Sequence, residues 1–184
     1  MTFLAKITNK PSSKGIRLRS HPFSNQVVKM LREQVKEMRL QLDTLRDSAH
    51  QWGRHPDWPW NGFILSYSTL GGSDNWDKNI KSKYETYYAW NVLAGQSPNE
   101  RATHFAELGN PRFRKRVSQW VAQSYDRIEK AGGPAVIRAD YKACSKAQDR
   151  INFIRSFPGF GEKYGRNIPM DCYDELVRDH FAID

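Results

Sequence analysis

Apolar residues recur at intervals of three and four along almost the whole of this 184-residue chain, and the alternation typical of strands is nearly absent. Intervals of three and four place side chains on one face of an α-helix, whereas a half-buried strand needs a period of two. Glycines, prolines and capping residues divide the periodic stretches into segments of helix length. The pattern therefore predicts an all-α domain of about eight helices.

The longest periodic segment runs from Ser24, a suitable cap, to about Trp52. Its apolar positions form a narrow heptad seam: Val28, Leu31, Val35, Met38, Leu42, Leu45, Ala49 and Trp52. One interpretation is a coiled coil with another chain, which would make this an interaction protein. We favour an amphipathic helix packed on the domain, because a single seam of this length in a globular chain more often belongs to the core.

Turn and capping signals predict the remaining helices. Ser97-Pro98-Asn99-Glu100 has the form of a capping box with Pro at the first helical position. Other helices are predicted over residues 61–70 and 74–94, from Asn110-Pro111 to about 131, from Pro134 to about 142, and from a cap at Ser145 onwards.

Positive charge dominates the chain, whose formal net charge is +9. Such a balance favours polyanionic partners, and nucleic acid is the first candidate. The first 32 residues contain no acid but seven cations: Lys6, Lys10, Lys14, Arg17, Arg19, Lys29 and Arg32. We interpret residues 1–23 as a basic arm that lies on a phosphate backbone. A transit peptide and a basic terminus without a partner stay open as alternatives.

The sequence offers little for metals or membranes. Its two cysteines, Cys144 and Cys172, lack Cys-x-x-Cys spacing, so we expect neither a zinc site nor an iron–sulfur cluster encoded in this chain. No apolar run approaches the length that spans a bilayer, so we expect no membrane partner.

Near the end of the chain, two helix-compatible segments flank the turn Pro158-Gly159-Phe160-Gly161. Pro158 fixes its own φ, and the two glycines allow conformations and close approaches that a Cβ would block. The amides that follow open a helix, and its positive end suits a phosphate. The glycine spacing fits neither the dinucleotide fingerprint nor a Walker loop. A purely structural corner between two helices stays open as an alternative.

Two further features accompany this turn: Lys163 lies two residues after the last hairpin glycine, and Phe181-Ala182-Ile183-Asp184 ends in an acid. The combination resembles the helix-hairpin-helix DNA glycosylase superfamily, the relatives of endonuclease III and oxoguanine glycosylase. The resemblance covers residues 145–184 well and 59–69 loosely. It implies a glycosylase-like helical domain over residues 24–184 with its hairpin at 149–172.

The resemblance also implies an activity and a pair of catalytic residues. The protein would be a base-excision repair N-glycosylase with AP lyase activity on a damaged or modified base. Lys163 would attack C1′ of the deoxyribose and form a Schiff base, while Asp184 stabilises the developing positive charge. The alternative is a helix-hairpin-helix DNA-binding module without chemistry. The residues do not specify which base is excised.

Other roles follow from the same resemblance. The partner is double-stranded DNA, bound by a monomer in the cytoplasm near the nucleoid or in the nucleus. The backbone would be held at Gly159, Gly161, Lys163 and Arg166. No cofactor is required, although a monovalent cation could bind the carbonyls of the following residues: Arg155, Phe157 and Phe160.

The segment Phe63–Thr69 resembles the family's Leu-Ser-x-x-Thr region. Family members carry a Gln or Asn near this point that fills the gap left by a flipped base. Tyr67 or Ser68 takes that place here, and an aromatic wedge would fill the gap by stacking. A plain core tyrosine is the alternative.

Overall fold

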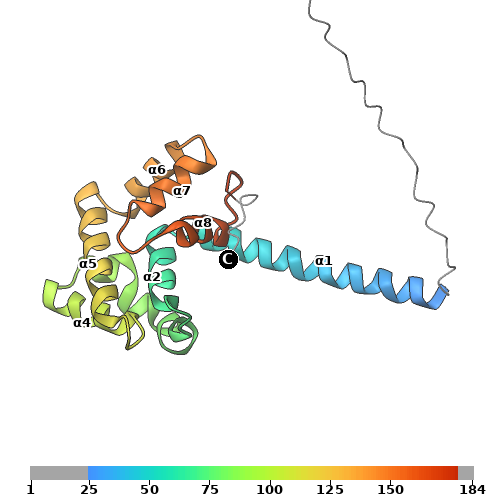
Figure 1. The fold of residues 1–184 in the computed structure, drawn as a ribbon, viewed down its shortest axis with the longest axis horizontal. Helices are drawn as coiled ribbons and strands as arrows, with labels where there is room; N and C mark the ends of the chain where they lie inside the picture. The colour runs from blue at the N-terminus through green and yellow to red at the C-terminus, as the bar shows by residue number, and fades with distance from the viewer. Residues whose placement is uncertain (1–24, 178–184) are drawn as a thin grey trace, which may run out of the picture. The chain divides into compact units, whose positions relative to one another are not determined.

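The computed structural model describes residues 25–177, so the predicted basic arm at 1–23 and Asp184 lie outside the described residues. The chain divides into two units, Met1–Gln41 and Leu42–Asp184. Within residues 25–177 the secondary structure is helical and no strand occurs, which confirms the all-α prediction (Figure 1). The eight α-helices of this part are α1 (Asn25–Arg54), α2 (Trp60–Thr69), α3 (Trp90–Ala94), α4 (Pro98–Leu108), α5 (Arg114–Ala131), α6 (Pro134–Ala143), α7 (Ala147–Arg155) and α8 (Glu162–Asp171).

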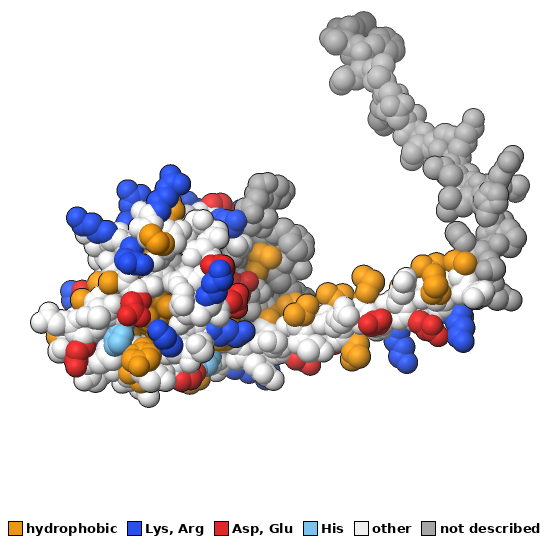
Figure 2. Space-filling model, turned by 90° about the horizontal axis from the view of Figure 1, so that it is seen from below, with side chains coloured by type: hydrophobic (Ala, Val, Ile, Leu, Met, Phe, Trp, Pro, Cys, Tyr) orange, Lys and Arg blue, Asp and Glu red, His pale blue; other side chains and the backbone are white. Residues whose placement is uncertain are grey.

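Helix α1 carries the heptad seam, and most of that seam faces solvent. Met38 is 59 %, Leu42 61 % and Leu45 66 % exposed, and Figure 2 shows a row of hydrophobic side chains along this helix. Leu42 and Leu45 belong to the second unit, which holds the core, so the predicted packing on the domain is wrong for these two positions. The last seam position packs against the core, where the Trp52 and Trp76 ring centroids lie 5.8 Å apart. Among residues 25–177, no helix is long and apolar enough to cross a membrane.

The predicted helix over residues 74–94 is replaced by a succession of short turns. These are the π-helices Trp76–Ile80 and Tyr84–Tyr88, the 3₁₀-helix Lys81–Lys83 between them, and α3. The core side chains of this stretch repeat every four residues: Trp76, Ile80, Tyr84 and Tyr88, all buried. A four-residue repeat drifts by about 40° per step around an α-helix of 3.6 residues per turn. The wider π-turns offset this drift and keep all four side chains on the core side.

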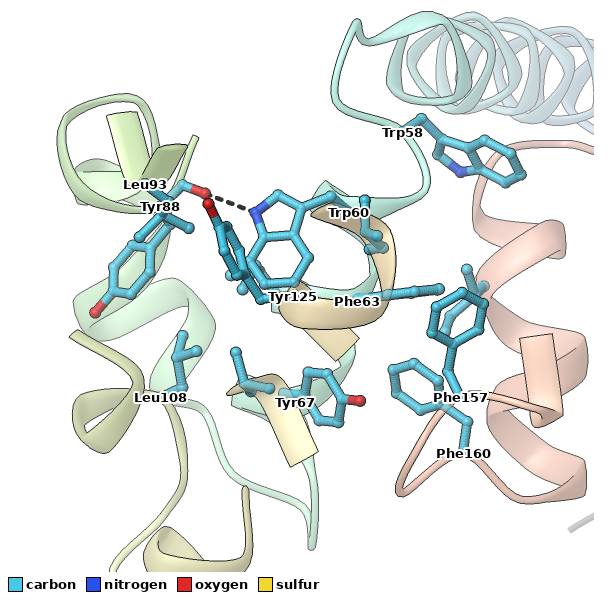
Figure 3. Packing of buried hydrophobic residues seen from close by; sticks show 14 of the residues in the cluster. Trp58, Trp60, Phe63, Tyr67, Tyr88, Leu93, Leu108, Tyr125, Phe157 and Phe160 are labelled. Atoms are coloured by element: carbon cyan, nitrogen blue, oxygen red, sulfur yellow. Dashed lines mark hydrogen bonds between the residues drawn. The ribbon is translucent and has the colours of Figure 1, made fainter. Parts of the chain in front are cut away.

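Helix α2 forms the centre of the core, where it contacts α4, α5 and α8 (Figure 1). Trp60, Phe63 and Tyr67 have no exposed surface. The Trp60 indole donates a 2.8 Å hydrogen bond from Nε1 to the carbonyl of Tyr88, drawn in Figure 3. A helix that is buried on all sides in this way fixes the positions of the helices around it.

The helix boundaries follow local signals, with two differences. The capping box of α4 is present: the Ser97 amide donates to the Glu100 carboxylate at 2.7 Å. Helix α5 begins at Arg114 and not directly after Pro111, because the Asn110 side chain accepts the amides of Arg112 and Phe113 in a preceding turn. Lys146, and not the predicted Ser145, occupies the N-cap position of α7.

Candidate nucleic-acid interface

Helices α7 and α8 form a tight hairpin, joined by residues 156–161. A Cβ on Gly165 of α8 would lie 2.6 Å from Arg155 Cγ and 3.1 Å from the Ile151 carbonyl oxygen, both on α7. Only glycine allows the two helices to approach this closely. The observed hairpin spans residues 147–171, close to the predicted range of 149–172.

Gly159 is the strained residue of the turn. Its φ is +81°, in the left-handed region that favours glycine. A Cβ at this position would lie 2.5 Å from the Trp120 ring of α5. The Trp120 ring therefore occupies the space that a side chain at position 159 would need.

Gly161, in contrast to Gly159, has open space where a side chain would lie. It is the N-cap residue of α8, with a φ of −89° that any residue adopts, and a Cβ here would meet nothing within 4 Å. Among the described residues, neither its amide nor that of Gly159 donates to an acceptor. The turn thus holds two backbone amides without an acceptor from the described residues, next to the positive end of a helix.

Tyr67 packs against Phe160 of the turn (Figure 3). Its ring stacks on Phe160 with centroids 4.6 Å apart and planes at 21°. Its hydroxyl donates a 2.6 Å hydrogen bond to the Pro158 carbonyl, so Ser124 Oγ, 2.9 Å away, donates to the tyrosine oxygen. Burial raises the pKa of Tyr67, which keeps the hydroxyl protonated as a donor.

This burial contradicts the predicted gap-filling role of Tyr67 and Ser68. Both residues have no exposed surface. Ser68 Oγ donates back to the Leu65 carbonyl at 2.7 Å, within its own helix. Neither side chain reaches the surface where a base stack would lie, so the core interpretation of Tyr67 applies.

Arg127 of α5 holds the start of the turn. Its Nη1 donates to the Ser156 carbonyl at 2.7 Å and its Nη2 to Ser156 Oγ at 3.0 Å. The guanidinium also lies 3.9 Å from the centroid of the Phe157 ring. Sequence reasoning missed both Arg127 and Trp120. Their spacing of seven on α5 places them on one face, but the spacing does not identify what that face contacts.

The predicted backbone-binding cations lie at the same end of the hairpin. Lys163 is exposed and is the second residue of α8. Arg166 Nη2 lies 2.6 Å from Glu162 Oε1, and Arg155 Nη1 lies 2.8 Å from Glu162 Oε2. Glu162 is thus neutralised by two arginines, and Arg166 would have to exchange this carboxylate for a phosphate.

The predicted cation site and catalytic pair remain predictions. The Phe157 carbonyl already accepts the Phe160 amide at 3.3 Å, whereas the carbonyls of Arg155 and Phe160 accept no backbone hydrogen bond among the described residues. Asp184 lies outside those residues, so its predicted pairing with Lys163 is untested.

No family model, curated protein or solved structure matches this chain. The function is therefore inferred from the hairpin and from the helices that hold it.

Proposed function

We propose that this protein binds the backbone of double-stranded DNA through the α7–α8 hairpin. The observation that carries the proposal is Gly161, whose amide has no acceptor among the described residues and whose side-chain position faces open space. Backbone amides at the start of a helix bind phosphate through hydrogen bonds and the helix dipole. A residue without a side chain lets a phosphate approach them closely.

Contacts from the core also hold the turn in place, which supports binding. Tyr67, Trp120 and Arg127 hold it from two core helices, so little conformational entropy is lost when a strand binds. Contacts of this kind fix the position of a duplex and carry no base information. The proposed binding is therefore independent of sequence and sensitive to salt.

Replacement of Gly161 by Asp tests this proposal. Asp is a favoured N-cap residue, so the variant should fold at least as well as the wild type. Its carboxylate would repel a phosphate at the same position. We expect the affinity for an undamaged duplex, measured by fluorescence anisotropy, to fall at least about tenfold, the equivalent of about 1.4 kcal/mol.

Gly95→Asp is the matched control, because a Cβ at Gly95 makes only ordinary contacts, the nearest at 3.6 Å from the Val92 oxygen. This variant adds the same charge away from the hairpin and should bind nearly as well as the wild type. Unchanged binding by Gly161→Asp would overturn the proposal.

The second candidate function is base excision at the same hairpin, and the position of Lys163 favours it. Its exposed side chain begins beside the turn that would hold the strand. The amine would attack C1′, the bond to the damaged base would break, and the base would leave with its bonding electrons. The opened sugar would form a Schiff base with Lys163, and β-elimination would then release the 3′ phosphate. Asp184 would stabilise the positive charge at C1′.

Borohydride trapping on DNA that contains an abasic site tests this chemistry. Reduction of the Schiff base should leave a covalent adduct with the wild type and none with Lys163→Gln. Lys130→Gln, an exposed lysine in the last turn of α5, serves as the control. Absence of an adduct with the wild type would sink the lyase function and leave the DNA-binding proposal standing.

A further inference from the structure

Helix α5 begins with an unusual concentration of positive charge. Arg112, Arg114, Lys115 and Arg116 precede or occupy its first turn, which contains no acidic residue. Cations at the positive end of a helix oppose its dipole and destabilise it. The placement is explained if an anion binds beside the helix.

Three of these cations line one hollow of about 340 Å³, together with Phe113 and Gln119. No Asp or Glu lines this hollow. Within residues 25–177, Arg112, Lys115 and Arg116 form no ion pair with a carboxylate. Three cations thus converge on a hollow without an anionic partner from the described part of the chain.

The hollow is linked to the hairpin along one face of α5. The Arg116 guanidinium lies 5.8 Å from the centroid of the Trp120 ring. Trp120 in turn packs on Gly159 of the turn. Residues four apart on a helix are neighbours, so Arg116, Trp120 and the turn follow one another across a short stretch of surface.

We infer that this hollow is a second phosphate site, which holds the backbone of the DNA that the hairpin binds. The guanidinium groups match phosphate oxygens with paired hydrogen bonds, and the lysine adds a point charge. The inference rests on the DNA binding proposed above and extends that surface to α5. A bound phosphate would also remove the conflict between the cations and the helix dipole.

Replacement of all three hollow cations by Gln (Arg112→Gln, Lys115→Gln, Arg116→Gln) tests the inference. The slope of log affinity against log salt is negative, and each lost phosphate contact should reduce its magnitude by about 0.9. For an undamaged duplex between 50 and 200 mM salt, we expect the magnitude of this slope to fall by about 1 to 2. The melting temperature of the free protein should stay equal or rise, because cations leave the positive end of α5.

The matched control removes three exposed lysines elsewhere in the domain: Lys83, Lys142 and Lys146. It makes the same change in net charge, so only the general electrostatic contribution should be lost. A hollow variant that binds with the salt slope of this control would overturn the inference. So would a lower melting temperature with unchanged binding, since that result assigns the cations a structural role.

Two further measurements separate the sources of failure. If the wild type does not bind the duplex, or binds it no more tightly than Gly161→Asp does, the proposed function fails and this inference fails with it. Inorganic phosphate alone should not raise the melting temperature of the protein as bound DNA would. If it raises the melting temperature of the wild type but not of the hollow variant, while both bind DNA equally, the hollow is a small-anion site and the inference falls.

Discussion

The hydroxyl of Tyr67 donates a 2.6 Å hydrogen bond to the carbonyl of Pro158, 91 residues later in the chain. The bond joins the central helix α2 to the hairpin turn. Because Tyr67 is fully buried, the turn takes its position from the core and not from its own sequence alone. The amides of the turn are therefore fixed relative to the domain that carries them.

Tyr67→Phe should destabilise the protein by about 1 to 2 kcal/mol, because it leaves the Pro158 carbonyl and Ser124 without their buried partner. The ring should still stack on Phe160. Urea denaturation measures the change. Tyr87→Phe is the control: Tyr87 is 40 % exposed, so its replacement should change stability by less than about 0.5 kcal/mol. Equal effects of the two substitutions would contradict the role given to Tyr67.

Gly159→Ala should cost about 1 to 3 kcal/mol, since the new Cβ combines an unfavourable positive φ with a clash against Trp120. Gly161→Ala should change stability little, because its Cβ meets open space at an ordinary φ. Denaturation of the two variants side by side tests the contrast. Comparable losses would show that the two glycines do not differ as described.

Asp171 should make stability depend on pH. It borders a hollow that Trp52, Leu65, Trp76 and Lys81 also line, and desolvation of its carboxyl group raises its pKa to about 6. The ordinary value is about 3.9. The folded protein therefore holds this proton more tightly than the unfolded chain. The stability contributed by the proton is complete below about pH 4 and is lost as the pH rises through about 6.

Asp171→Asn keeps the uncharged form at every pH. The variant should be more stable than the wild type at pH 7, by about 1 kcal/mol or less, because Asp171 is an exposed residue and solvent screens its charge. The difference should vanish near pH 4. Urea denaturation at several pH values measures it, with the exposed Asp140→Asn as control. Parallel pH curves for the wild type and Asp171→Asn would refute the prediction.

Two positions of the heptad seam, Leu42 and Trp52, should respond differently to truncation. Leu42→Ala should cost less than about 0.5 kcal/mol, because Leu42 is 61 % exposed. Trp52→Ala should cost about 2 to 3 kcal/mol, because its ring packs against Trp76 and Tyr84. A large loss in Leu42→Ala, especially one that depends on protein concentration, would show that the seam is covered by another chain.

Local signals in the sequence were reliable where the determining contacts are local. The capping box at Ser97 and the glycines of the hairpin act within a few residues, so their patterns predicted the start of α4 and the turn between α7 and α8. The seam was harder to interpret, because a heptad pattern is the same whether a helix packs on its own domain or presents an open face. Residues 74–94 were misassigned because a four-residue repeat resembles an α-helical one.

The sequence by itself determined an all-helical chain with a glycine-containing hairpin, since periodicity, caps and turn residues act through the backbone close to where they stand. Only the tertiary structure decided which residues support that hairpin. Tyr67, Trp120 and Arg127 reach it from α2 and α5, and contacts between distant segments leave no spacing signal in one sequence. Tertiary packing likewise buried Tyr67 in the core and left Gly161 exposed, because exposure depends on what the rest of the fold places around each residue.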